Sequence, residues 1–300
     1  MVIDTPGGGV RFWQTPERRA GWQYPLGVIL FLAAQALGVA ATLALRGTGS
    51  AGWLATATGL GVQALVAVAL YRLLIHRLAG RGVHELGQGG AAGEFGLGLA
   101  IGTALMAVVA GTLAALGVLR VEGSSSSGGI LVGLMIGVGA AFAEEIFFRG
   151  ILLRLLDRHF GTWPALAYTA VVFGAVHLVN PEATAWGAVA ITIEAGLLLG
   201  AAYLYTRRLW LPIGIHLAWN AMLGGVIGSD VSGAGLDSGG LLTTTIEGPD
   251  WLDGGSMGLE GSVVTVVAGL ALGIWLLRGA ARRGHLTPAH LPWRTPSPWA

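Results

Sequence analysis

AFAEEIFFRGIL, residues 141–152, places two adjacent glutamates and an arginine inside an otherwise apolar run. Only 11% of the 300 residues are charged, and most of these lie at the ends of apolar segments. Ionisable side chains at membrane depth are costly, and they usually face a bundle interior or a water-filled cavity, where they mark function. Glu144, Glu145 and Arg149 therefore suggest a polar site inside a membrane.

The rest of the chain is strongly apolar. Hydrophobic residues make up 54% of the sequence and the mean hydropathy is +0.69, which is unlike an ordinary soluble domain. Several apolar runs have the length of about 17–25 residues that crosses a hydrocarbon core as a helix. We therefore predict an all-α, polytopic membrane protein, with about eight transmembrane helices and a central intramembrane polar site. The predicted spans are about Pro25–Leu45, Trp53–Ile75, Phe95–Leu119, a span from Ile130 through the glutamates, a span from a Gly161–Pro164 turn to Val179, then Ala185–Tyr205, Leu209–Ile227 and Ser262–Leu277.

The placement of arginine predicts the orientation of the spans. The turns after the second, fourth and sixth spans carry arginine, as do both tails, whereas the alternate loops carry only Arg46 and Arg120. Because basic residues stay on the cytoplasmic side, we expect both termini to be cytoplasmic and the protein to lie in the cell membrane. The predicted parts are an N-terminal tail (1–24), three spans with their loops (25–129), a core of four spans (130–227), an extracytoplasmic acidic Gly-rich loop (228–261), and a last span with a cytoplasmic tail (262–300).

Composition also excludes several classes of partner and chemistry. The net charge of +1 indicates no nucleic-acid partner. The absence of cysteine excludes disulfides and thiolate catalysis. All basic residues other than histidine are arginine, and alanine and glycine are abundant, which indicates a GC-rich bacterial genome.

Three pairs of residues fall at helical i, i+4 spacing within the core, so that each pair shares one helix face. Arg149 is best placed to neutralise Glu145, and Glu144 lies about 100° round the helix, where it can point elsewhere. The pairs are Glu145 with Arg149, Phe173 with His177, and His216 with Asn220.

Depth in the membrane brings these pairs together. Glu144 lies 17 residues before Gly161 and His177 lies 16 residues after it, so an antiparallel hairpin places both at one level. His216 lies eight residues beyond Arg208, which is roughly 12–15 Å below the cytoplasmic charges at a rise of about 1.5 Å per residue. We therefore expect one carboxylate and two imidazoles to converge within the membrane, provided that the fourth span continues past Arg149.

Hydrolysis is the chemistry that suits such a set. A glutamate and a neutral histidine can hold and deprotonate a water molecule, while a second histidine and an asparagine amide can donate hydrogen bonds to an oxyanion. Neither a Ser-His-Asp nor a Gly-x-Ser-x-Gly arrangement is visible, so a nucleophilic mechanism has no candidate. Glu144, His177 and His216 are also a possible zinc set, although the sequence has no His-Glu-x-x-His motif.

The order and spacing of the polar motifs carry a resemblance to a known family. The motifs are Glu144-Glu145-x-x-x-Arg149, Phe173-x-x-x-His177 and His216-x-x-x-Asn220. They resemble the three motifs of the CAAX-protease and bacteriocin-processing (CPBP, or Abi) family of intramembrane proteases, over about residues 130–225. Each motif alone is weak, but the ordered trio is specific.

The resemblance implies a role for each residue. Glu144 and His177 would activate water, His216 and Asn220 would form the oxyanion site, and Glu145, Arg149 and Phe173 would support them. The family has been described both as metalloproteases and as metal-independent glutamate proteases. We expect the latter, with no cofactor, because the second histidine and the asparagine have a natural oxyanion role; a divalent metal such as zinc is the alternative.

The expected activity is that of an intramembrane endopeptidase acting on a membrane-embedded or lipid-modified peptide in the lipid bilayer. Bacteria generally lack prenylated CAAX proteins, so the family name does not by itself give the substrate. A non-catalytic membrane protein, such as a bacteriocin-immunity factor or an interaction scaffold, is the alternative. A transporter ranks last, because no inverted repeat is evident. Glu194, in the sixth span, lies outside the trio, and we expect it to line the cavity or to pair with Arg207 or another span.

Overall fold

The structure is a computed structural model that describes residues 19–125, 128–235 and 239–289. The expected tails are therefore described only in part, since residues 1–18 and 290–300 lie outside the described ranges. Eight helices in the described ranges are long and apolar enough to cross a membrane. The prediction of a polytopic helical membrane protein is confirmed. These spans are Ala20–Gly47, Gly52–Ala79, Ala91–Ala115, Gly128–Phe160, Thr162–Val179, Ala185–Thr206, Trp210–Ile227 and Gly255–Arg282.

Several spans are built from more than one kind of helix. The α-helices are α1 (Ala20–Gly47), α2 (Gly52–Leu74), α3 (Ala91–Ala115), α4 (Gly128–Glu145), α5 (Arg154–Phe160), α6 (Thr162–Val176), α7 (Ala185–Ile191), α8 (Leu198–Thr206), α9 (Trp210–Asn220), α10 (Asp250–Asp253) and α11 (Val263–Arg282). The wider π-helical stretches are η2 (Ile75–Ala79), η4 (Ile146–Leu153), η6 (Thr192–Leu197) and η7 (Ala221–Ile227). Short 3₁₀ turns are η3 (His84–Leu86), η5 (His177–Val179) and η8 (Gly255–Gly261).

The span that carries the glutamates is the longest of the eight. It runs without a break from Gly128 to Phe160 as α4, η4 and α5, for 33 residues. Arg149 and Leu155 therefore lie inside the span, as the depth argument required. The break that follows is shorter than expected, because Gly161 alone turns the chain, with φ +85°, and α6 begins at Thr162. Pro164 is accommodated in the first helical turn, where a missing N–H costs little.

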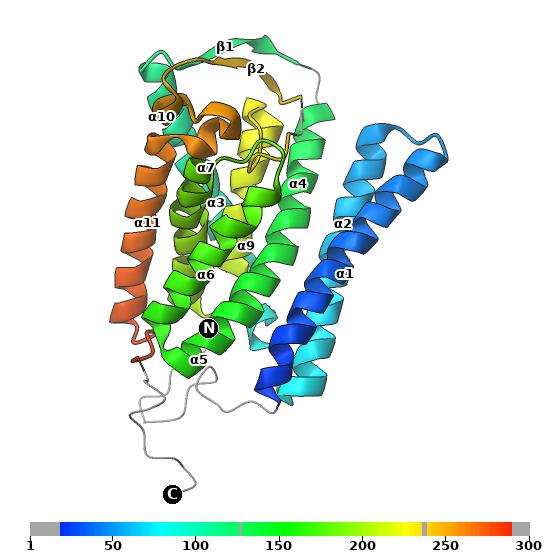
Figure 1. The fold of residues 1–300 in the computed structure, drawn as a ribbon, viewed down its shortest axis with the longest axis vertical. Coiled ribbons are helices and arrows are strands. Elements are labelled where there is room, and N and C mark those ends of the chain that lie inside the picture. Colours follow the sequence, from blue (N-terminus) through cyan, green and yellow to red (C-terminus); the bar gives the residue numbers. More distant parts are fainter. Residues whose placement is uncertain (1–18, 126–127, 236–238, 290–300) are drawn as a thin grey trace, which may run out of the picture.

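Two strands that were not foreseen close one end of the bundle (Figure 1). β1 (Leu119–Ser124) pairs antiparallel with β2 (Leu242–Ile246), with Leu119 opposite Ile246. The expectation that the third span reaches Leu119 is thus wrong, because the helix ends at Ala115 and Gly117 turns the chain with φ +76°. The region expected to be one long loop contains β2, α10 and η8.

The first two spans form a hairpin beside the other six (Figure 1). α1 and α2 diverge from the bundle towards the end that carries the sheet, and they lie closer to it towards the end that carries α5. Two buried polar side chains of α2 fasten this hairpin to the fourth span. Gln63 donates to the carbonyl of Gly139 (3.2 Å) and the Tyr71 hydroxyl donates to the carbonyl of Gly150 (3.1 Å).

A buried ionic network stabilises the end of the bundle that carries α5. Arg207 donates to Asp157 (2.6 Å), and Arg154 donates to Gln23 (2.7 Å), with all four side chains buried. Arg207 lies in the turn after the sixth span, as the sequence predicts, and its side chain is buried. Removing one partner of such a buried pair leaves an uncompensated charge, which typically costs about 3–5 kcal/mol.

Close packing of α3 against α9 positions the helix that carries His216. A Cβ atom at Gly98 would lie 2.9 Å from the Gly214 Cα and 3.0 Å from the Ile215 nitrogen. Both of these are backbone atoms, which cannot move aside as a side chain can. Small residues allow such close contacts between membrane helices.

We predict that Gly98→Leu lowers the thermal unfolding temperature of the detergent-solubilised protein by several degrees, because overpacking a close contact costs about 1–3 kcal/mol. Gly96→Leu is the matched control, since a Cβ on Gly96 meets no atom within 4 Å. Equal unfolding temperatures for the two variants would contradict this role of Gly98.

Candidate active site

The four residues expected to be catalytic line a single cavity of about 450 Å³. Glu144 comes from α4, His177 from η5, and His216 and Asn220 from α9. Apolar side chains of α1, α4, η4 and α6 complete the wall, together with the segment Val231–Ala234; they include Phe31, Leu32, Ile136, Phe148 and Val176. The wall is mainly apolar and carries several polar groups, which is typical of a ligand site.

Glu145 is the polar centre behind this cavity. Its carboxylate is completely buried, and its Oε1 accepts hydrogen bonds from Arg149 (2.7 Å) and from Nδ1 of His216 (2.9 Å). Because a carboxylate accepts, His216 carries its proton on Nδ1. The sequence suggested Arg149 as the partner of Glu145, but it did not reveal the bond to His216, whose residue number differs by 71.

Three hydrogen bonds and an aromatic ring surround the guanidinium of Arg149, which is buried in a membrane span. Besides Glu145, it donates to the carbonyls of Ala195 (3.0 Å) and Gly196 (3.1 Å), and its guanidinium lies 4.5 Å from the centre of the Phe173 ring. The two carbonyls belong to η6, where the wider helical geometry displaces the regular i to i+4 hydrogen bonds. Phe173 thus supports the site as a cation–π partner.

Glu144 lines the larger cavity, whereas the neighbouring Glu145 does not. Its side chain is 17% exposed, whereas that of Glu145 is 0% exposed. Its Oε2 lies 4.0 Å from Nε2 of His216 and has no hydrogen-bond partner in the described part of the chain. One glutamate of the doublet is therefore hydrogen-bonded to the protein, and the other has an oxygen without a partner in the described residues.

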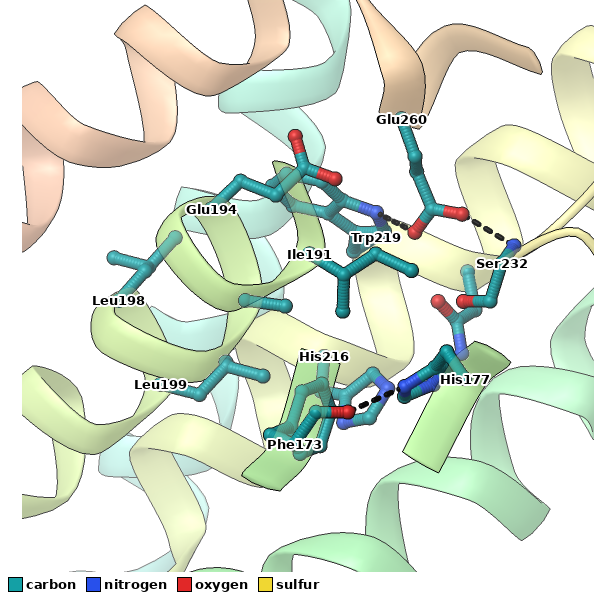
Figure 2. A pocket seen from close by; sticks show the side chains of 12 residues that line it. Phe173, His177, Ile191, Glu194, Leu198, Leu199, His216, Trp219, Ser232 and Glu260 are labelled. Atoms are coloured by element: carbon teal, nitrogen blue, oxygen red, sulfur yellow. Dashed lines mark hydrogen bonds between the residues drawn. The ribbon is translucent and has the colours of Figure 1, made fainter. Parts of the chain in front are cut away.

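His177 is held by the end of the helix that carries it. Its Nδ1 lies 2.6 Å from the carbonyl oxygen of Phe173, as Figure 2 shows. Because a carbonyl only accepts, Nδ1 carries the proton, and Nε2 of the neutral ring is left to accept one. His177 lines the same cavity as Glu144, although no direct contact joins the two side chains in the described structure.

Asn220 completes the set at the end of α9. It is buried, it lines the cavity one turn after His216, and its amide makes no hydrogen bond to another described residue. Its two N–H donors are therefore available to a bound oxygen atom.

A second, smaller cavity shares part of its lining with the first (Figure 2). The volume open to the centre of a water molecule is about 10 Å³, which is room for about one water molecule. His177, His216, Asn220 and Ser232 line both cavities. The smaller one is also lined by two buried carboxyl groups, those of Glu194 and Glu260.

These two carboxyl groups differ in their bonding. Neither oxygen of Glu194 has a hydrogen-bond partner in the described residues. The sequence suggested Arg207 as one partner for Glu194, but Arg207 donates to Asp157. Glu260 accepts hydrogen bonds from Nε1 of Trp219 (2.8 Å) and from the backbone N–H of Ser232. The sequence placed Glu260 in an extracytoplasmic acidic Gly-rich loop, and no pattern in it indicated that Glu260 is buried.

The donors do not assemble into a metal site as they are placed. Glu144, His177 and His216 are the kinds of ligand that zinc takes. Within the described ranges, however, no group of three or more His, Cys, Asp or Glu side chains is arranged to hold a metal ion.

Comparison with known proteins identifies the central part of the chain. Residues 126–222 match the family described as type II CAAX prenyl endopeptidase Rce1-like. No curated protein and no solved structure matches the chain. The matched segment contains all three polar motifs, from Glu144 to Asn220. Residues 126–222 therefore form an Rce1-like domain of the CPBP (Abi) family, within a multi-pass membrane protein.

Proposed function

We propose that this protein is an intramembrane endopeptidase that hydrolyses a peptide bond in a membrane-embedded or lipid-modified substrate. One observation carries the proposal: Glu144, His177, His216 and Asn220, from three separate spans, line one cavity. The apolar wall of that cavity suits an acyl, prenyl or transmembrane segment. Its polar part suits the peptide bond to be cut.

The proposed reaction begins with a water molecule held between Glu144 and His177. The Glu144 carboxylate and Nε2 of His177 are the groups that can accept its proton, so the water oxygen can attack the carbonyl carbon of the peptide bond. The C=O double bond becomes a single bond, and the oxygen gains a negative charge. Asn220 donates N–H to this oxyanion, which stabilises the tetrahedral intermediate.

His216 assists at the same point. To donate to the oxyanion its Nε2 must carry a proton, and the Glu145 carboxylate on Nδ1 is the counter-charge that an imidazolium requires. The intermediate then collapses: the C–N bond breaks, and the leaving nitrogen takes the proton that Glu144 and His177 removed from water. The products are a carboxylic acid and an amine, so every atom of the water is accounted for.

We predict that Glu144→Gln and His177→Ala each lower kcat by at least about 100-fold, because a general base contributes about 10²–10⁴-fold. Asn220→Ala lowers kcat by about 10²–10³-fold with little change in KM, because its donors act on the transition state. Cleavage is measured in detergent with a quenched fluorogenic peptide that ends in a prenylated Cys-a-a-X sequence, compared with the same peptide without the lipid.

Peptides that accumulate in cells expressing Glu144→Gln supply a second set of substrates for the purified wild-type protein. Undiminished hydrolysis by Glu144→Gln or by His177→Ala contradicts the proposed mechanism. A wild-type protein that cleaves neither the prenylated peptide nor the accumulated ones contradicts the proposed activity.

We propose in addition that the reaction needs no metal, because Asn220 and His216 supply the oxyanion stabilisation that a Lewis acid would otherwise provide. EDTA or 1,10-phenanthroline is therefore expected to change the cleavage rate by less than about two-fold. Loss of activity that added zinc restores would show a metal-dependent reaction.

The proposed orientation places both termini in the cytoplasm. α1 begins and α11 ends at the same end of the bundle (Figure 1), and the buried arginines Arg154 and Arg207 lie in or next to the helices at that end. A fluorescent protein fused to either terminus is expected to fluoresce, and a periplasmic phosphatase fused there is expected to be inactive. Active phosphatase at the C-terminus would reverse the orientation.

A further inference from the structure

Glu260 is an acidic side chain that the proposed reaction does not use, although it lies next to the catalytic groups. It is in η8, just before α11, and it is 3% exposed. It lines the smaller cavity together with His177, His216 and Asn220. A carboxylate buried this deeply costs free energy unless its oxygens are hydrogen-bonded, and Glu260 meets that requirement with two donors.

The two donors belong to two different parts of the site. Nε1 of Trp219 donates to Oε1 at 2.8 Å, and the backbone N–H of Ser232 donates to Oε2 (Figure 2). Trp219 is the residue before Asn220 in α9. Ser232 lines both cavities.

From Ser232, a chain of hydrogen bonds leads on to His177. The carbonyl of Ser232 accepts from Nδ2 of Asn180 (2.7 Å), and the backbone N–H of Asn180 donates to the carbonyl of His177 (3.0 Å). Hydrogen bonds therefore link the turn that holds His177, through Ser232 and Glu260, to the helix that holds Asn220.

We propose that Glu260 is a positioning residue that fixes the distance between the water-activating His177 and the oxyanion donors on α9. The inference rests on the proposed function, since it concerns the same site. A carboxylate suits this position because it accepts two N–H bonds and donates none. Glutamine is nearly the same size, but its carbonyl accepts at one end while its NH₂ group would face the second donor.

The first arm of the test compares kcat and KM for Glu260→Gln, with Glu247→Gln as the control. Glu247 belongs to the same acidic region and is exposed. Glu260→Gln is expected to lower kcat by about 10- to 100-fold with KM within about two-fold, because small displacements of catalytic groups cost rate. Assays run well below the unfolding temperature of each variant separate this effect from a loss of folded protein.

A double variant tests whether the two bonds act together. Trp219→Phe removes one of the two N–H donors. In the double variant the glutamine side chain from Glu260→Gln needs only one acceptor, and its carbonyl can accept from the Ser232 N–H. Trp219→Phe combined with Glu260→Gln is therefore expected to lose no more kcat than Glu260→Gln alone. Fully additive losses, or an unchanged kcat in Glu260→Gln, overturn the proposal.

The second arm does not depend on activity. Hydrogen exchange of the full chain in detergent is expected to be faster at the Ser232 amide in Glu260→Gln, and unchanged in Glu247→Gln and in Glu144→Gln. Unchanged exchange in Glu260→Gln overturns the proposal even if kcat falls. If Glu144→Gln retains hydrolysis, the proposed function fails by itself, and the exchange arm then decides whether Glu260 holds the segment above the site.

Discussion

The buried guanidinium of Arg149 is the constraint on which the rest of the site depends. An arginine inside a membrane span is tolerated only where other groups replace the water that it has lost. Here a carboxylate, two carbonyls and an aromatic face do so, from three different spans. Those partners cannot move without leaving part of the charge unsatisfied. The cation therefore fixes the relative positions of η4, η6 and α6.

The same requirement explains why the two glutamates have different environments. Glu145 is committed to Arg149, and its remaining capacity orients His216. Glu144 has neither bond, and its side chain is the more exposed of the two. A rigid carboxylate beside an uncommitted one suits the proposed hydrolysis, in which one holds the geometry while the other exchanges protons with water.

Irregular helices make this arrangement possible. In a continuous α-helix each carbonyl already accepts from the N–H four residues on, so only its second lone pair is left for a side chain such as that of Arg149. The π-helical stretch η6 provides the carbonyls of Ala195 and Gly196. Further π-helical stretches begin directly after Glu145 and directly after Asn220. The site is thus built where three spans depart from α-helical geometry, and a bilayer tolerates such departures only where protein surrounds them.

How much of the structure the sequence predicts depends on how far apart in the sequence the interacting residues lie. The spans could be predicted because hydrocarbon thickness sets their length, and the Glu145–Arg149 pairing because it spans one helical turn. The bonds from Glu145 to His216 and from Glu260 to Trp219 join residues 71 and 41 positions apart. No local pattern encodes them. Glycines flank Glu260 and suggest a loop, whereas its burial depends on the packing of Trp219.

Four residues line both cavities, and this decides how the site responds to change. They are His177, His216, Asn220 and Ser232. A side chain beside open space has fewer packing neighbours, so hydrogen bonds must fix its position. Nδ1 of each histidine is fixed in this way, by the Phe173 carbonyl and by Glu145. The Asn220 amide is not, and its position depends on the backbone of α9, which Trp219 ties to Glu260.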